Sequence, residues 1–238
     1  MRKTWAICRK ELQSFFYSPV AYVAFAFYAL LSSVMFYMNF VGMQPSIIDV
    51  RYIVSNTAFI YLFIIPLLTM RLMADEFRQG TDELLLTSPT SLTEIVLGKY
   101  AAALVVNTAL MAFSFIYALI MAAYGPLDQP VLWLSYLSIF LVGAAMMAVG
   151  LFASCLSSNQ MVGGIIGLVI LLLFWVMDAI GNSFTGKLKD IITQFSLSNR
   201  SINLQKGILS GVDIFFYIGL VIVFLVLSIQ VVQRKRWR

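Results

Sequence analysis

Long uninterrupted runs of apolar residues, separated by short polar segments, dominate the sequence. A run of about 20 apolar residues suffices for a helix to cross the hydrocarbon core of a bilayer. Six runs of this kind predict transmembrane helices over residues 20–41, 52–73, 96–123, 132–156, 162–180 and 214–232. A β-barrel would instead show short strands of alternating polarity. The pattern therefore predicts an all-α, polytopic membrane protein, with residues 1–238 forming a single transmembrane domain.

Residues 2–18, ahead of the first run, alternate basic and apolar side chains at helical spacing. This pattern is typical of an amphipathic helix lying in the membrane interface. Pro19 is expected to end that helix. The apolar run that follows is too long for the core of a signal peptide, and no small-residue cleavage site follows it. We therefore expect a permanent first span.

The composition supports the membrane assignment and removes several function classes. Of 238 residues, 61% are hydrophobic and 11% charged, whereas soluble domains carry about 25% charged residues. A soluble enzyme, a disordered chain and a disulfide scaffold are thus excluded. The chain has no histidine, the commonest general base and metal ligand, and Cys8 and Cys155 are too few for a cysteine-based metal site. We expect no metal or cofactor on this chain.

The net charge of +5 points to lipid and not to nucleic acid. The basic residues flank the apolar runs instead of forming one face, so their expected partner is the anionic surface of the bilayer. Eleven of the sixteen Lys and Arg residues fall on the side of the N-terminus. Cytoplasmic segments of membrane proteins carry such an excess. The bias predicts that both termini are cytoplasmic.

The segment 74–95 between the second and third spans concentrates charge, with five of the eleven acidic residues of the chain. Several of its residues favour helix ends and turns. These are Gly80, Thr81, Pro89 and the pair Ser91 and Glu94, which has the spacing of a capping box. The segment is expected to be a short helix held between two spans. It is either a solvated connector or an element that transmits force from a soluble partner.

The stretch from Glu76 to Lys99 resembles the cytoplasmic segment of ABC transporter permeases of the type-2 exporter class. Those permeases show an acidic–basic pair, then Gly-Thr-x-Glu-Leu-Leu, Thr-x-Pro and Ile-x-x-Gly-Lys. The matching positions are Glu76, Arg78, Gly80, Thr81, Glu83, Leu84, Leu85, Thr87, Pro89, Ile95, Gly98 and Lys99. The interfacial helix and the six-span layout extend the resemblance over nearly the whole chain. Among subfamilies, the chain is most similar to the gliding-motility and copper-enzyme-maturation permeases.

This resemblance implies a permease that works as a dimer, with a second copy or a paralogue. A separate ABC ATPase would bind ATP and Mg and dock on the coupling segment. The implied ATPase-coupling residues are Asp75, Glu76, Arg78, Gly80, Thr81, Asp82, Glu83, Leu84, Leu85 and Pro89. An amphiphilic substrate would be exported across the cytoplasmic membrane of a bacterium or archaeon. The amphipathic segment 181–212 would form short external helices at the exit.

Gly181–Lys187 fits the first seven positions of a P-loop, but this fit is misleading. The eighth residue, Leu188, has no hydroxyl for Mg²⁺, and the segment follows a membrane helix where a P-loop requires a strand. We therefore expect no nucleotide binding on this chain. The ATPase must come from a partner.

Small and polar residues inside the spans are candidates for packing and transport. Gly163 and Gly167 have the small-xxx-small spacing of close helix packing, either inside the chain or at a dimer seam. Asn107 and Asp178 are candidate pathway residues, because polar groups at membrane depth are functional candidates. Asp178 alternatively reaches the outer interface.

Two other function classes stay open at the level of sequence. An integral-membrane lipid-modifying enzyme would need a metal-binding group of acids at the membrane surface. A passive channel or scaffold would act without nucleotide.

Overall fold

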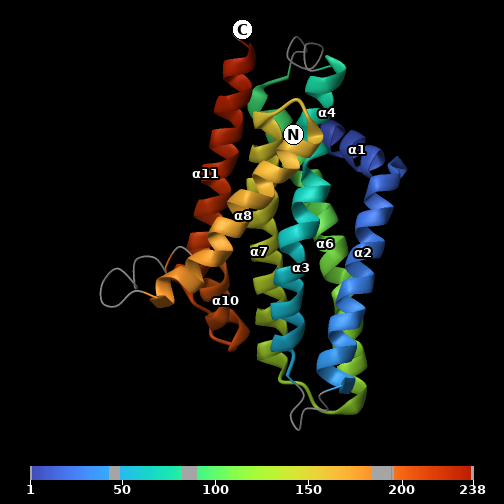
Figure 1. Ribbon diagram of the computed structural model, residues 1–238, viewed down its shortest axis with the longest axis vertical. Coiled ribbons are helices and arrows are strands. Elements are labelled where there is room, and N and C mark those ends of the chain that lie inside the picture. Colours follow the sequence, from blue (N-terminus) through green and yellow to red (C-terminus); the bar gives the residue numbers. More distant parts are fainter. Residues whose placement is uncertain (1, 43–48, 82–89, 184–193, 195, 237–238) are drawn as a thin grey trace.

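The computed structural model describes residues 2–42, 49–81, 90–183, 194 and 196–236. The regular elements of these residues are all helical, and six stretches are long and apolar enough to cross a membrane. The all-α polytopic class is therefore confirmed. The long helices lie side by side in an elongated bundle (Figure 1).

The helices have the following bounds. They are α1 (Arg2–Tyr17), α2 (Pro19–Phe36), the π-helix η1 (Tyr37–Gly42), α3 (Arg51–Thr69), α4 (Arg71–Gln79), α6 (Leu92–Tyr124), α7 (Gln129–Leu156), α8 (Gln160–Ser183), α10 (Leu197–Gln205) and α11 (Gly211–Arg236). Helices α1 and α4 and the C-terminal part of α11 lie at one end of the bundle, here called the terminal end (Figure 1). The connection between α6 and α7 lies at the opposite, distal end.

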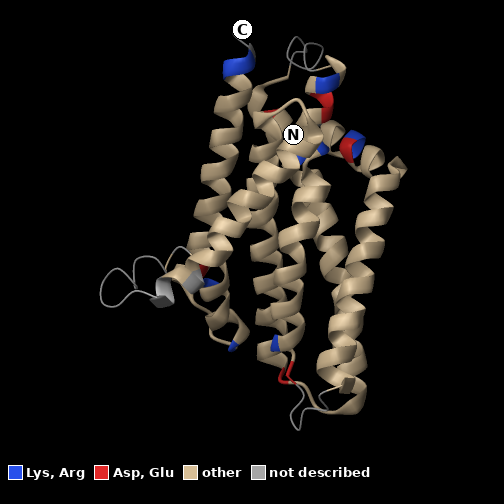
Figure 2. Cartoon of the chain, viewed as in Figure 1, with Lys and Arg blue, Asp and Glu red and all other residues tan. Residues whose placement is uncertain are grey.

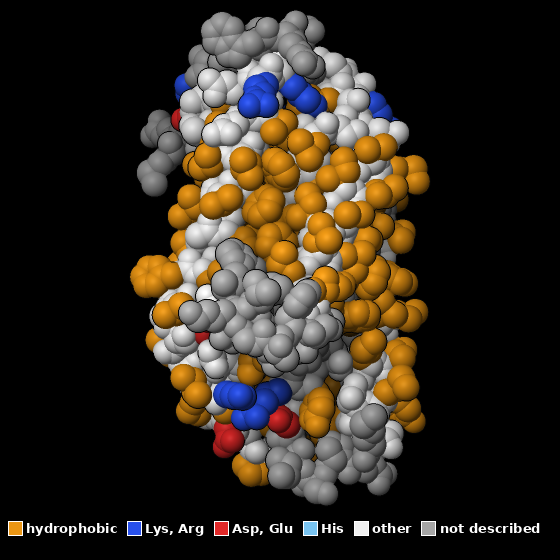
Figure 3. Space-filling view, turned by 60° about the vertical axis from the view of Figure 1, so that its left-hand side comes forward, with side chains coloured by type: hydrophobic (Ala, Val, Ile, Leu, Met, Phe, Trp, Pro, Cys, Tyr) orange, Lys and Arg blue, Asp and Glu red, His pale blue; other side chains and the backbone are white. Residues whose placement is uncertain are grey.

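An apolar band covers the surface between these two ends (Figure 3). Large side chains such as Phe27, Leu119 and Leu173 are exposed there. Lys and Arg side chains are visible above and below the band. An apolar surface of this extent matches the hydrocarbon core of a bilayer, where it is not exposed to water.

Local sequence signals set several helix ends as expected. Pro19 occupies the first turn of α2, and Ser18 before it is extended, so α1 ends where predicted. Ser91 and Glu94 form the predicted capping box. The Glu94 N–H donates to Ser91 Oγ at 3.2 Å, and the Ser91 N–H donates to Glu94 Oε2 at 3.0 Å. Helix α6 therefore begins at Leu92, four residues before the expected span.

The second span departs from the expected single helix over 52–73. Pro66 lies inside α3, and the helix is interrupted at Met70, after which α4 begins. Ser154 of α7 occupies the break. Its Oγ donates to Met70 O at 2.8 Å and accepts from the N–H groups of Met73 and Ala74 at 3.0 and 3.1 Å. A side chain inserted into the helical hydrogen-bond ladder is a recognised cause of such breaks.

Helix α10 lies within the segment 181–212 that was expected to hold external helices, and it packs against α7 (Figure 1). It is anchored to the start of α11. Arg200 and Asn203 donate to the buried Asp213 carboxylate at 2.9 and 2.8 Å, and Tyr217 Oη donates to Leu197 O at 2.7 Å. Arg200 thus balances the negative charge of Asp213, which is shielded from solvent in the first turn of α11.

Helix α7 lies at the centre of the bundle and packs against α3, α4, α6, α8, α10 and α11. Its glycines allow close approach of its neighbours. A Cβ added at Gly143 would lie 2.0 Å from Asn107 Oδ1, and one added at Gly150 would lie 2.1 Å from Thr69 Oγ1. The backbone of α7 is thus in direct contact with polar side chains of α6 and α3.

We expect Gly143→Ala to lower the free energy of unfolding by about 1–3 kcal/mol, the usual cost of overpacking. The atoms in its way belong to the Asn107 side chain beyond Cβ, so adding Asn107→Ala should recover most of the loss. Gly219→Ala is the matched control, because nothing lies within 4 Å of its added Cβ. Denaturant titration in detergent measures the three variants and the unmodified chain. Equal losses of unfolding free energy in Gly143→Ala and Gly219→Ala would contradict the close contact between Gly143 and Asn107.

Candidate coupling site at the terminal end

Charged residues of α1 and α4 gather at the terminal end (Figure 2), where two of their carboxylates contact a lysine of α6. Their centre is Lys99, whose side chain is only 1% exposed. Its ammonium lies 2.7 Å from Glu11 Oε1, 2.6 Å from Leu72 O and 3.0 Å from Glu76 Oε1. An ammonium has three N–H donors. Each donor therefore has an acceptor, and the three acceptors come from two other helices.

The residue before Lys99 explains how α1 comes so close to α6. A Cβ added at Gly98 would lie 2.9 Å from both Ile7 Cβ and Thr4 O. Because Gly98 has no side chain, the backbone of α1 packs closely against α6 at this point. The next residue, Lys99, binds the Glu11 carboxylate of α1. Cys8 is buried on the same face of α1. Burial and then the nearby Glu11 charge raise the pKa of the Cys8 thiol, which keeps it neutral.

Helix α4 ends at Gly80, as its sequence predicted. Gly80 has φ +67°, the left-handed region that glycine adopts without strain. The N–H of Thr81 donates to Glu76 O at 3.1 Å and so satisfies a carbonyl of the last turn. Residues 82–89, which continue the segment 74–95 that was expected to form a short helix, lie outside the described residues.

Helix α4 is held by side chains from several other helices. Ser154 of α7 binds its first turn, as described above. Gln160, the first residue of α8, donates to the carboxylate of Asp75. Lys10 of α1 lies 3.6 Å from Glu76 Oε1, and Lys235 of α11 lies 3.6 Å above the ring of Phe77. A displacement of α4 therefore acts on α1, α6, α7, α8 and α11 together.

A pocket of about 340 Å³ lies between α1, α4 and α6, with polar and apolar walls. Its lining residues are Lys10, Glu11, Ser14, Phe15, Arg71, Leu72, Asp75, Glu76, Gln79, Thr81 and Lys99. The Arg71 guanidinium lies 4.2 Å above the Phe15 ring. Arg71 Nη2 and Glu76 Oε2 are buried and make no hydrogen bond within the part of the chain that the structure describes. Buried polar atoms of this kind favour a partner that supplies the missing bonds.

The structure places half of the expected coupling residues at this end. Asp75 and Glu76 contact other helices, Arg78 lies 3.5 Å from Asp75, and Gly80 and Thr81 close α4. The others lie outside the described residues. They are Asp82, Glu83, Leu84, Leu85 and Pro89.

The polar and small residues singled out in the spans lie away from this end or inside the bundle. Asn107 is fully buried between α6 and α7, where its Nδ2 donates to Phe140 O at 3.3 Å. Gly163 and Gly167 face α7 inside the chain, with an added Cβ at Gly167 lying 3.3 Å from Ala153 Cβ. Asp178 belongs to α8, and its side chain is not described.

The P-loop-like stretch Gly181–Lys187 is described only in its first three residues. Gly181–Ser183 continue α8, whereas a P-loop begins as a loop after a strand. The rest lies outside the described residues.

Sequence reasoning did not select Glu11, Lys99, Ser154 or Gln160 as site residues. Two of them carry a signal. Lys99 stands within an apolar run, where an ionisable residue is a functional candidate, and Glu11 is the single acid of α1. The other two, Ser154 and Gln160, carry no signal in the sequence, because serine and glutamine are common near helix ends. The contact of Gln160 with Asp75 also shows that the short turn between α7 and α8 reaches α4.

The helices, the apolar band and the charged terminal end together define a polytopic membrane protein. The family model of the ABC-2 type transporter matches residues 2–178. The chain therefore belongs to the ABC-2 type transporter family, as the stretch from Glu76 to Lys99 indicated. The similarity to the gliding-motility and copper-enzyme-maturation subfamily stays a prediction. No curated protein sequence matches the chain.

No group of three or more His, Cys, Asp or Glu that could hold a metal occurs among the residues described here. Of the described acids at the terminal end, Glu11, Asp75 and Glu76 are instead engaged with Lys99, Lys10, Arg78 and Gln160.

We expect Lys99→Met to lower the free energy of unfolding by about 3–5 kcal/mol, because it removes the cation of the buried Glu11 carboxylate and the nearer of the two cations at Glu76. Adding Glu11→Gln and Glu76→Gln should recover at least half of this loss. Lys10→Met is the control, since the Lys10 side chain is 66% exposed and such pairs contribute at most about 1 kcal/mol. Denaturant titration in detergent measures the variants. A Lys99→Met effect no larger than that of Lys10→Met would contradict the network.

Proposed function

We propose that this permease exports an amphiphilic substrate, driven by a separate ABC ATPase that docks at the terminal end. Membership of the family establishes the chain as the membrane component of an ABC transporter and implies an ABC ATPase partner. The direction of transport, the docking surface and the substrate class belong to the proposal. Its main support is the buried network of Glu11, Lys99 and Glu76, which joins α4 to α1 and α6.

The proposed docking surface consists of α4, the segment 82–89 and the pocket of about 340 Å³ beside α1. Arg78 and Gln79 are exposed at the end of α4, where a partner reaches them. Charged rim residues of this kind set the rate and orientation of docking more than its strength. The sequence continues with the acids Asp82 and Glu83, which we also propose to take part in docking.

Movement of the ATPase would act first on α4 and then on the helices attached to it. Lys99 would carry the displacement to α6 and α1, Ser154 to α7, Gln160 to α8 and Lys235 to α11. Helix movements of this kind open and close access to the two sides of a membrane. The bound ATP and Mg would belong to the ATPase.

In this proposal the terminal end faces the cytoplasm, in the inner membrane of a bacterium or archaeon, and α10 lies on the outer side. The excess of Lys and Arg on that end supports the orientation. A second copy of the chain or a paralogue would complete the transporter. Gly163 and Gly167 are already used inside the chain, so the dimer seam is proposed to involve other residues.

We expect a photo-crosslinking amino acid at Gln79 to capture an ABC ATPase in native membranes. The same amino acid at Gln129, which is exposed at the distal end, should not capture it. Purification of the tagged chain and mass spectrometry identify the captured protein by its nucleotide-binding motifs. Capture at neither position, or equally at both, would refute docking on α4.

The orientation has a separate test based on the two native cysteines, which are both buried. Ser158→Cys and Gln129→Cys introduce exposed thiols at the terminal and distal ends, respectively. In intact cells, a membrane-impermeant maleimide should label the distal thiol and leave the terminal thiol unlabelled until the cells are permeabilised. The reverse order would place the terminal end outside.

A further inference from the structure

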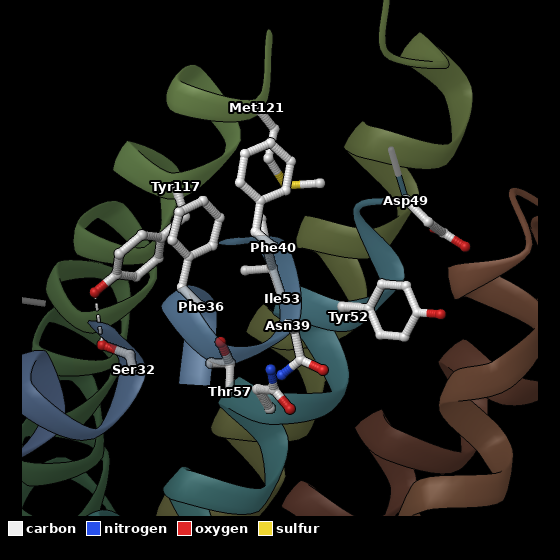
Figure 4. A pocket seen from close by; sticks show the side chains of 11 residues that line it. Ser32, Phe36, Asn39, Phe40, Asp49, Tyr52, Ile53, Thr57, Tyr117 and Met121 are labelled. Atoms are coloured by element: carbon white, nitrogen blue, oxygen red, sulfur yellow. Dashed lines mark hydrogen bonds between the residues drawn. The ribbon is translucent and has the colours of Figure 1, made fainter. Parts of the chain in front are cut away.

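The distal half of the chain contains a narrow pocket that the coupling site does not explain. It lies between α2, η1, α3 and α6, far from the terminal end. One wall is aromatic and the other is polar (Figure 4). The aromatic wall consists of Phe36, Phe40 and Tyr117. The polar wall includes Asn39 and Asn56, with Asp49 at its rim.

The aromatic wall is an ordered stack. The ring of Phe36 lies between those of Phe40 and Tyr117, with centroid distances of 5.2 and 4.9 Å and interplanar angles of 17° and 25°. The Tyr117 hydroxyl is fixed at 2.9 Å from both Ser32 Oγ and Ser33 Oγ (Figure 4 draws the first). The stack gives this wall a rigid apolar surface.

The polar wall offers hydrogen-bond acceptors. Asn39 Nδ2 donates to Met35 O at 2.8 Å, so its amide oxygen remains as an acceptor. Among the described lining residues, Asp49 is the one acid and none is basic. Asp49 Oδ1 accepts a hydrogen bond from the Arg51 backbone N–H at 2.9 Å, and its other carboxylate oxygen makes no hydrogen bond to the described residues that line the pocket. The Arg51 guanidinium lies 3.6 Å from Oδ1, but both side chains are substantially exposed, so this ion pair is weak. The charge balance of the pocket therefore favours a cation over an anion.

The backbone also marks the pocket as a site. The π-helix η1 supplies Asn39 and Phe40, and single π-helical turns are frequent at functional sites.

The size of the pocket restricts the ligand. Its free volume is about 20 Å³, which holds a single water-sized group. A primary ammonium has that size and three N–H donors, whereas a trimethylammonium is larger and has none. We propose that the distal pocket binds the primary ammonium head of an amphiphile, whose alkyl chain lies in the bilayer beside α2 and α3. This binding needs no ATPase and so is independent of the proposed docking.

Binding of radiolabelled dodecylammonium to the purified full chain tests the proposal. With the chain in phosphatidylcholine nanodiscs and empty nanodiscs as background, we expect saturable binding of one ligand per chain. Dodecyltrimethylammonium and dodecyl sulfate should compete at least tenfold more weakly than unlabelled dodecylammonium. Absence of saturable binding, or equal competition by the sulfate, would overturn the proposal.

Matched variants locate the site. Asp49→Asn and Asn56→Leu should each weaken binding roughly tenfold, which corresponds to the loss of one charge-assisted or polar contact. Asp128→Asn removes an exposed acid at the same end but outside the pocket, and it should leave binding unchanged. Size-exclusion profiles confirm that each variant is folded. Equal affinities in Asp49→Asn, Asn56→Leu and Asp128→Asn would place the ligand elsewhere and overturn the assignment.

The same ammonium chemistry occurs in a free long-chain amine and in the headgroup of phosphatidylethanolamine. Repeating the titration in nanodiscs containing half phosphatidylethanolamine separates these sources. A weaker apparent affinity for dodecylammonium identifies the lipid as an occupant of the site. An unchanged affinity identifies the free amine as the preferred ligand.

Discussion

The ammonium of Lys99 is the interaction on which the terminal end depends. Removing a charge from water is costly unless its hydrogen bonds are replaced and its charge is balanced. Lys99 meets both conditions, because Glu11, Glu76 and Leu72 O occupy its three donors. Lys10 beside Glu76 then brings the cluster to two positive and two negative charges. Moving α1 or α4 away from α6 would separate the buried Lys99 ammonium from a carboxylate that balances its charge.

A second constraint comes from the backbone. A helix interrupted near a membrane leaves N–H and C=O groups that lipid cannot satisfy. At Met70 a single hydroxyl, that of Ser154, satisfies two N–H groups and one C=O group of the interrupted helix. The break between α3 and α4 is thus stabilised by α7, the central helix. A displacement of α4 is passed to the centre of the bundle as well as to its rim.

The sequence predicted those features that depend on neighbouring residues. Pro19, Gly80 and the capping box of Ser91 and Glu94 act within one helical turn, and each sets its helix end as expected. The six spans follow from length and hydropathy alone. Features that depend on distant residues were missed. Glu11 and Lys99 are 88 residues apart, and nothing local to either indicates the other. The break in the second span is another such feature, because the hydroxyl that occupies it belongs to Ser154 of another helix.

The two ends of the bundle share helices, and this arrangement limits how they can be coupled. Helix α6 carries Lys99 near one end and Tyr117 of the distal pocket near the other, which are 18 residues or about 27 Å apart along a continuous helix. Helix α3 connects the polar wall of the pocket to α4, but only through the break at Met70. A continuous helix moves as a rod, whereas a break held by α7 absorbs part of a displacement. Any effect of α4 on the distal pocket should therefore travel through Lys99 and α6 more than through α3.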